Sequence, residues 1–206
     1  RIDGPRSHQT KLGTPTMGGL MIVVPIVLIT VVLNIYYLSG ATVIGQSILV
    51  PLGVMVAFAV IGGVDDIAGV RGMRNGEGLK ARQKIWWEVA IAVAVAVAMK
   101  LIPLQYAGQM WLPGLRQPIE LGWWWVPIAA FVIVSMSNAV NLTDGMDGLA
   151  GIIVASAAVP LGVIALLQGQ EYLVRFCFTM VGACFAFLWF NAHPAQMFMG
   201  DTGSMF

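Results

Sequence analysis

The sequence has 206 residues, of which 58% are hydrophobic and only 10% are charged, with a formal net charge of +1. A soluble domain carries about 25% charged residues, so this composition excludes an ordinary soluble domain and favours a bundle of membrane helices. With so few basic residues, the net charge does not indicate nucleic acid as a partner. Cys177 and Cys184 fall in one apolar stretch, which is typical of free thiols in a packed helix and not of a disulfide or metal pair.

Six apolar segments are long enough, or nearly so, to cross about 30 Å of hydrocarbon as helices of about 20 residues. In chain order they are 16–38, 43–64, 85–102, 122–140, 149–167 and 174–190. We therefore expect an all-α, polytopic transmembrane helix bundle that forms a single integral membrane domain over residues 1–206. The sequence starts with Arg1, has no signal peptide and stops as another apolar segment begins, so we expect a fragment of a longer membrane protein.

The Lys and Arg residues predict how these spans are oriented. Eight of them fall in the segments on the side of Arg1, and three fall on the other side. The positive-inside rule places the side that is richer in basic residues in the cytoplasm. The predicted cytoplasmic segments are 1–15, 65–84, 141–148 and 191–204. Trp111 and the Trp run at 123–125 then lie at the outer interface, where Trp is common and needs no catalytic explanation.

Nearly every unusual polar motif falls in one of these cytoplasmic segments. The motifs are KLGTPTMGG at 11–19, the acidic pair at 65–66, NAVNLTDGMDG at 138–148 and NAHPAQMFMGDTGS at 191–204. The outer loops are comparatively featureless. We therefore expect any chemistry to take place at the cytoplasmic face.

Five aspartates gather on this side, at or near helix ends. They are Asp65, Asp66, Asp144, Asp147 and Asp201. Ionisable groups at membrane depth are costly unless they pair, bind ions or line water, and five carboxylates repel one another unless a cation lies among them. Mg²⁺ prefers oxygen ligands and substrate phosphates, and no Cys and His pattern indicates zinc. Because Lys11, Arg82 and Lys84 are suited to hold phosphate oxygens, the set is typical of phosphoryl transfer.

The spacing of the polar residues adds detail. Neighbours on a helix point about 100° apart, so Asp65 and Asp66 cannot both face one ion. Asn138 and Asn141 share a helix face at a spacing of three residues, and the two aspartates that follow continue the same step. The glycines on either side of Asp201 permit the backbone to approach a phosphate closely.

Each motif alone has a simpler interpretation. An Asp pair at a helix end is usually a cap, an Asp-Gly step is usually a turn, and Asn in a membrane helix often bonds to a neighbouring helix. His193 before Pro194 is typical of a helix end, and His8 is typical of a solvated segment. The placement of all the motifs on one face favours a site over these separate interpretations.

Over these motifs the sequence closely resembles the phospho-N-acetylmuramoyl-pentapeptide transferases, within the polyprenyl-phosphate sugar-1-phosphate transferase superfamily. The matching stretches, in family order, are 4–19, 62–66, 78–84, 138–151 and 190–204. The resemblance implies transfer of phospho-MurNAc-pentapeptide from UDP-MurNAc-pentapeptide to undecaprenyl phosphate, giving lipid I and UMP in peptidoglycan synthesis, with Mg²⁺ as cofactor. It also implies a bacterial inner-membrane protein of about ten spans, often a homodimer, whose first helix and later helices lie outside this chain.

The resemblance further implies roles for particular residues. Asp201 matches the metal ligand, and together with Asp65 and Asp66 it matches the catalytic carboxylates. The positions that match substrate-binding residues are Lys11, Thr16, Lys84, Asn138, Asn141, Asp144, Asp147 and Asn191. The sequence departs from the family at Gly69, where a Lys is common, and Arg71 is the nearest basic substitute. The family's His-rich cytoplasmic loop lies beyond the last residue of the chain.

Other functions fit parts of the pattern. A related UDP-GlcNAc transferase shares the Asp pair and the Asp-Gly stretch but usually lacks the GTPTMGG and NAHPA forms. An ion-coupled transporter also needs intramembrane acids, but it predicts charges near mid-span and an inverted repeat, and neither is evident here. A structural scaffold gives no reason for five acids on one side.

Overall fold

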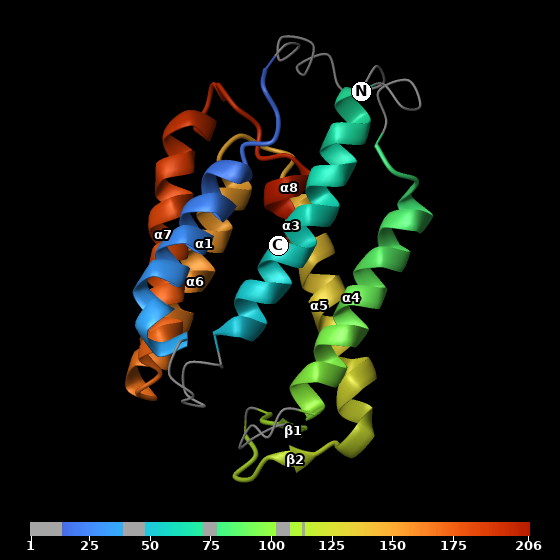
Figure 1. Ribbon diagram of the computed structural model, residues 1–206, viewed down its shortest axis with the longest axis vertical. Helices are drawn as coiled ribbons and strands as arrows, with labels where there is room; N and C mark the ends of the chain where they lie inside the picture. The colour runs from blue at the N-terminus through green and yellow to red at the C-terminus, as the bar shows by residue number, and fades with distance from the viewer. Residues whose placement is uncertain (1–13, 39–47, 72–77, 102–107, 113) are drawn as a thin grey trace.

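The computed structural model describes residues 14–38, 48–71, 78–101, 108–112 and 114–206, with the side chains of 34–38 left out (Figure 1). Within these residues, long helices run up and down between two ends of the molecule. They are α1 (Leu20–Leu38), α3 (Leu49–Val70), α4 (Ala81–Leu101), α5 (Trp125–Thr143), α6 (Leu149–Leu167) and α7 (Glu171–Asn191). The short elements are η2 (Gly122–Trp124) before α5 and α8 (Asp201–Ser204) after α7.

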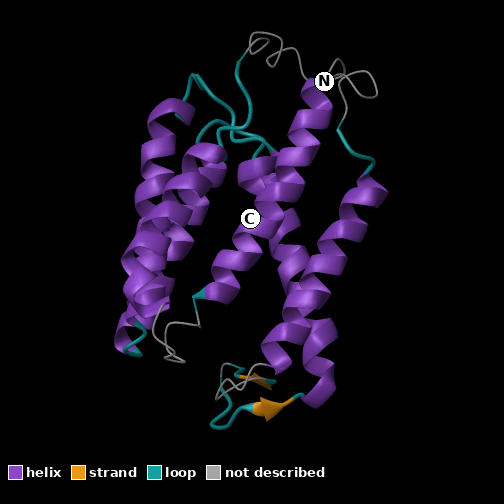
Figure 2. Ribbon diagram, in the orientation of Figure 1, coloured by secondary structure: helices purple, strands orange, loops and turns teal. Residues whose placement is uncertain are grey.

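The strands of the described part are confined to one small hairpin. β1 (Gln109–Met110) and β2 (Ile119–Glu120) pair antiparallel, with Gln109 opposite Glu120 and Met110 opposite Ile119. Figure 2 shows this hairpin at the end of the bundle that is opposite α8. The predicted all-α fold is therefore confirmed.

Several of the long helices can cross a membrane by length and composition. Those found among the described residues are Leu49–Val70, Gly122–Thr143, Leu149–Leu167 and Glu171–Asn191, with a shorter apolar helix at Leu20–Leu33. Helix α4 differs because it carries more charged residues, with Arg82 and Lys84 in its first turn, Glu88 further inside and Lys100 in its last turn. Large apolar side chains such as Trp189, at 84% exposure, and Leu167, at 83%, face outward, which suits contact with lipid. The chain is therefore a multi-pass membrane protein. Each of the six predicted spans overlaps one long helix of the described residues, and four of these helices meet the requirement of length and composition.

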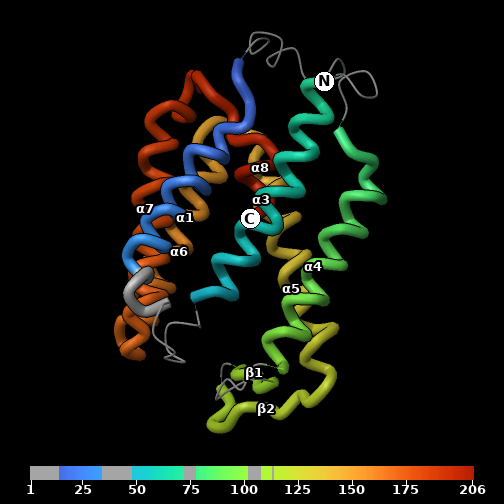
Figure 3. Tube along the Cα trace, viewed as in Figure 1, coloured from blue at the N-terminus to red at the C-terminus, as the bar shows by residue number. Residues whose placement is uncertain are grey.

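The long helices form two groups that meet at α8. Helix α7 packs against both α6 and α1, whereas α4 packs against both α3 and α5. Helix α8 contacts α3 most extensively and also touches α1 and α5, so it lies where the two groups join (Figures 1 and 3). The loops after α5 and α7 and the segment before α1 reach this same end of the bundle (Figure 3).

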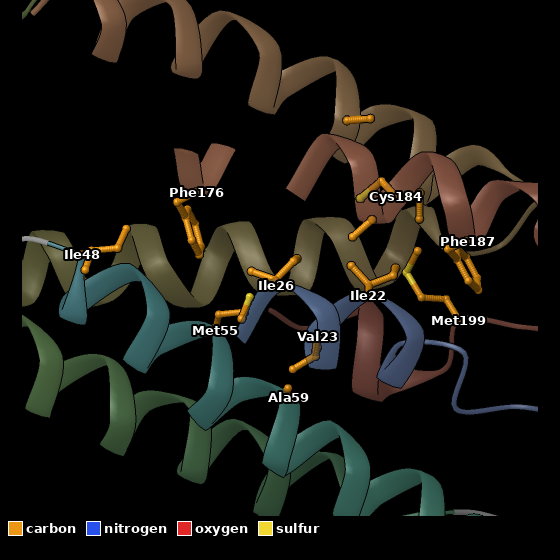
Figure 4. Close-up of a cluster of buried hydrophobic side chains, with 13 residues drawn as sticks. Ile22, Val23, Ile26, Ile48, Met55, Ala59, Phe176, Cys184, Phe187 and Met199 are labelled. Atoms are coloured by element: carbon orange, nitrogen blue, oxygen red, sulfur yellow. The ribbon is translucent and has the colours of Figure 1, made fainter. Parts of the chain in front are cut away.

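A buried apolar cluster joins α1, α3, α6 and α7 below this end. Ile22 and Ile26 of α1 and Phe187 of α7 are fully buried members of this cluster, and Met55 brings α3 into it (Figure 4). Met199, two residues before α8, is also buried in it. The loop that leads to α8 is therefore anchored to the apolar interior of the bundle.

The helix ends differ from the predicted spans where charged residues occur. Helix α3 continues to Val70, so Asp65 and Asp66 lie in its last two turns and not in the connecting segment. Helix α4 begins at Ala81, which places Lys84 in its first turn. Hydropathy marks where a helix leaves the hydrocarbon, whereas backbone hydrogen bonding continues as long as the polar side chains find partners.

Candidate active site

The site is built around helix α8, at the end of the bundle where α3 and α5 terminate and α4 begins. The backbone turns into α8 at Gly200, whose φ of 70° and ψ of 174° favour glycine. Asp201 is the first residue of α8 and is half-buried. Its carboxylate contacts side chains near the ends of three longer helices, α3, α4 and α5.

Four side chains from four different helices meet at this carboxylate. We call them the Asp201 cluster, which consists of Asp65 of α3, Lys84 of α4, Asn141 of α5 and Asp201 itself. Lys84 forms an ion pair with Oδ2 of Asp201, and Asn141 Nδ2 donates a hydrogen bond of 2.9 Å to its Oδ1. Asp65 shares a hydrogen bond with the Asp201 carboxyl and accepts one of 2.6 Å from the backbone N–H of Leu79. The structure thus brings together four residues that the sequence predicts as site residues.

The pKa values of Asp201 and Asp144, two acids at this end of the bundle, shift in opposite directions. Burial raises the pKa of Asp201, but hydrogen bonds with the other three members of the cluster outweigh burial and hold the pKa below its usual value. Asp144 follows the last residue of α5 and has no such partner in the part of the chain that the structure describes. Burial, and then the charges of Asp201, Asp66 and Asp147, raise the pKa of Asp144 to about 7. Negative charge is therefore concentrated here, which favours a bound cation.

Asp66 holds the start of α8. Its carboxylate accepts hydrogen bonds from Asp201 N at 3.0 Å, from Thr202 N at 2.9 Å and from Thr202 Oγ1 at 2.6 Å. A carboxylate placed on free N–H groups at a helix start acts as a cap. Asp65 and Asp66 thus contact different groups of Asp201, its carboxyl and its backbone N–H, and Asp66 positions α8. That the two acids cannot face one ion, and that Asp66 is catalytic, stay predictions.

The GTPTMGG motif contacts the loop that carries Asp201. Gly18 N and Gly19 N donate hydrogen bonds of 2.9 and 2.8 Å to the carbonyls of Phe198 and Met199. Met17 adopts a φ of 68°, a strained value for a residue with a side chain, and this conformation precedes both donors. The motif therefore ties the start of α1 to the approach to α8.

The glycines near Asp201 allow other parts of the protein to pack closely against the backbone of this loop. A Cβ on Gly200 would lie 2.6 Å from Asp66 Oδ2 and 2.9 Å from Thr16 Oγ1, and one on Gly203 would lie 2.6 Å from Cα of Gly19. Thr16 is exposed and lies beside this turn. The expected approach of these glycines to a phosphate stays a prediction.

Two predicted substrate-binding residues, Asn191 and Asp147, bond to the loops at this end. Asn191 is buried, accepts a hydrogen bond of 2.9 Å from Gly148 N and donates one of 2.8 Å to Met197 O. Asp147 contacts His193 Nδ1 at 3.0 Å and accepts a weaker bond from a backbone N–H. These side chains brace the segments on either side of the site, and neither bonds to Asp201. Lys11 lies outside the described residues.

The sequence reasoning missed two polar residues of this region. Glu88 of α4 is completely buried and accepts a hydrogen bond from Asn138, a predicted site residue that does not reach Asp201. Ser204 accepts a bond of 2.8 Å from Asn141. A signal for Glu88 was available, because it is an acid inside an apolar segment and follows Lys84 by one helical turn.

The donors of the site suit a hard cation that the substrate helps to bind. Among the described residues, no group of three or more His, Cys, Asp or Glu side chains is arranged to hold a metal by itself. Mg²⁺ is commonly held by one or two carboxylates and completes its shell with water and substrate phosphates. The oxygen atoms of Asp65 and Asp201 fit that requirement.

The sequence matches one protein family over most of its length. The family described as glycosyl transferase family 4 matches residues 48–206, and phospho-N-acetylmuramoyl-pentapeptide-transferase signature 1 matches residues 11–23. The signature includes the GTPTMGG motif, which contacts the loop before α8.

Curated relatives align with the whole chain. They include proteins of Chloroflexus aurantiacus strain J-10-fl (44% identity, 55% of that protein), Desulfotalea psychrophila (42%, 59%) and Geobacillus thermodenitrificans (41%, 61%). Each alignment covers 100% of this chain, and each protein is named phospho-N-acetylmuramoyl-pentapeptide-transferase. The chain thus spans little more than half the length of these relatives. Because the family match covers well over half of the chain, the protein belongs to glycosyl transferase family 4.

Proposed function

We propose that the protein transfers phospho-MurNAc-pentapeptide from UDP-MurNAc-pentapeptide to undecaprenyl phosphate in the bacterial inner membrane, giving lipid I and UMP. The site lies at the cytoplasmic face in this proposal. The family membership and the shared name of the curated relatives support the choice of reaction. The positive-inside pattern of the sequence supports the orientation.

The observation that carries the proposal is the Asp201 cluster. It places two carboxylates, an ammonium group and an amide at one end of a membrane bundle, next to the start of a helix. A membrane-embedded lipid phosphate and a water-soluble nucleotide can meet only at such a boundary. Carboxylates for a metal and a cation for phosphate are the groups that phosphoryl transfer requires.

In the proposed reaction, an oxygen of the lipid phosphate attacks the sugar-bearing phosphorus of the donor. The new P–O bond forms as the bond from that phosphorus to the bridging oxygen breaks, and UMP leaves with the bonding electrons. A phosphate monoester has a second pKa of about 6, so at neutral pH this nucleophile is already mostly ionised. Asp65, which is held by Leu79 N–H and Asp201, therefore acts mainly by positioning.

The remaining residues of the cluster supply binding and orientation. Lys84 is largely buried, with a side-chain exposure of 16%, and offers its ammonium group to the donor phosphates. Asn141 holds Asp201 through one oxygen and so keeps the carboxylate in one orientation. Asp201 and Asp65 would hold Mg²⁺, which when bound would neutralise the diphosphate charge.

UMP release by the intact protein in detergent tests this proposal. The assay contains undecaprenyl phosphate and Mg²⁺ with either UDP-MurNAc-pentapeptide or UDP-GlcNAc as donor. We expect release with the muramoyl donor only, and a loss of at least about 100-fold in Asp201→Asn. Glu171→Gln is the matched control, because it also converts a carboxylate to an amide but lies 74% exposed at the opposite end of the bundle.

Each other outcome changes the assignment. Release with UDP-GlcNAc alone would make the protein a GlcNAc-1-phosphate transferase. No release with either donor would leave ion-coupled transport as the function to test. Equal activity of Asp201→Asn and Glu171→Gln would remove Asp201 from the site.

A further inference from the structure

Glu88 is an ionisable residue that the proposed chemistry does not use. It lies on α4 with no exposed surface. One carboxylate oxygen accepts a hydrogen bond from Asn138 Nδ2 of α5, whereas the other, Oε1, is buried without a hydrogen-bond partner among the described residues. Ionisable residues at membrane depth are costly, so a buried acid that uses only one of its two oxygens requires an explanation.

The surrounding contacts supply one. Glu88 follows Lys84 by four residues on α4, and Asn138 precedes Asn141 by three residues on α5, so each pair lies on one helix face. The inner pair, Glu88 and Asn138, bonds directly across the two helices. The outer pair, Lys84 and Asn141, bonds to the two different oxygens of Asp201. The rotation and height of α5 against α4 thus decide whether both outer side chains reach one carboxylate.

We infer that the Glu88–Asn138 hydrogen bond is a clamp that sets the register of α4 against α5, and that Glu88 is thereby a positioning residue for the Asp201 cluster. This inference rests on the proposed function for its effect on catalysis. It also assigns Asn138 a different task from the substrate contact that its sequence match implies, because the Asn138 amide is engaged by Glu88 and by Val134 O at 2.9 Å.

The surroundings of the clamp argue against a role in packing alone. Small apolar side chains on the same helix, Ala92 and Ala96, are also fully buried and need no polar partner. An apolar residue at position 88 would satisfy packing and would avoid an unpartnered oxygen. An apolar residue cannot accept the hydrogen bond from Asn138, and the direction of that bond fixes the register of α4 against α5.

The test compares Glu88→Gln with Glu88→Leu in the intact protein. Gln retains a carbonyl oxygen that accepts from Asn138, whereas Leu of similar size does not. We expect Glu88→Gln to keep kcat within about twofold and Glu88→Leu to lower kcat about tenfold, with the KM for the nucleotide donor nearly unchanged in both, because misplacement of the cluster slows the chemical step. Glu171→Leu, the same replacement at an exposed position on α7, is the control and keeps kcat.

A second measurement does not depend on activity. Unfolding midpoints in detergent are compared for Glu88→Leu, Asn138→Leu and the double variant. With a clamp, the double variant loses no more than the more damaging single change, since both remove the same bond. Additive losses would overturn the clamp. A folded, active Glu88→Leu with normal kcat would overturn its effect on the site, as would a Glu88→Gln as slow as Glu88→Leu. Inactivity of the unaltered protein would instead refute the proposed function and leave the midpoint test of the clamp valid.

Discussion

Replacing Gly62 with alanine tests whether the contact between α3 and α8 places Asp201. Gly62 is buried on α3, three residues before Asp65. A Cβ at this position would lie 2.1 Å from the carbonyl oxygen of Asp201 and 2.4 Å from its carbonyl carbon. These are backbone atoms, so no side-chain rotation relieves the collision.

The size of the effect follows from this geometry. Ordinary van der Waals contact begins near 3.4 Å, so the Asp201 carbonyl must retreat by about 1.3 Å from its distance of 2.1 Å. That shift exceeds what the hydrogen bonds of 2.9–3.0 Å between Asp66 and the start of α8 tolerate. We expect a loss of about 1–3 kcal/mol in stability from overpacking and a fall of about 100-fold in kcat from misplacement of the carboxylate.

Gly63 provides the matched control. A Cβ there would lie 3.6 Å from Thr202 Oγ1, which is an ordinary contact, and alanine is the better helix former. UMP release and the unfolding midpoint in detergent are measured for Gly62→Ala, Gly63→Ala and the parent. Equal behaviour of the two variants would refute the conclusion that close packing at Gly62 positions α8.

Two further predictions concern the loops beside the site. Asn191→Leu leaves the Gly148 N–H and a backbone carbonyl without their partner and should cost at least about 2 kcal/mol of unfolding free energy; the exposed Gln168→Leu is the control, and an equal effect of both would contradict the bracing role. Because the pKa of Asp144 is raised from 3.8 to about 7, the folded state holds a proton that the unfolded state has released. Its contribution to stability therefore falls as pH rises from about 4 to about 7 and is constant above that. Asp144→Asn should reduce the change of the unfolding midpoint with pH between about 4 and about 7. The same pH profile in the variant and the parent would argue against the raised pKa.

The sequence predicts those features that depend on local composition and periodicity. Each of the six apolar runs predicts one of the long helices found among the described residues, and the 149–167 segment matches α6 at both ends. The three-residue spacing predicts that Asn138 and Asn141 share one face of α5, but it does not show that they bond to different helices, Asn138 to Glu88 of α4 and Asn141 to Asp201 of α8. Because successive spans cross the membrane in opposite directions, the sequence predicts that the acids gather at one end of the bundle. The contacts among Asp65, Asp66 and Asp201 confirm this for those three residues.

Features that depend on contacts between distant segments were not predictable from these patterns. Asp66 and Asp201 are both acids near helix ends, and only the fold shows that one caps the helix that begins with the other. The glycines at 18 and 19 also serve a purpose that requires the loop before α8 to be in place. The partner of Glu88 lies on another helix, and no local spacing identifies it.

The pairing of Gly18 and Gly19 with Phe198 and Met199 has a consequence for biogenesis. Chains are made from the N-terminus, so α1 enters the membrane long before the segment that it will bond has been synthesised. Until residues 197–204 arrive, Asp66 lacks the backbone N–H donors of Asp201 and Thr202, and Asp65 lacks the Asp201 carboxyl. The site therefore assembles only after residues 197–204 have been made, and a nascent chain arrested before them would carry the acids without the helix that organises them.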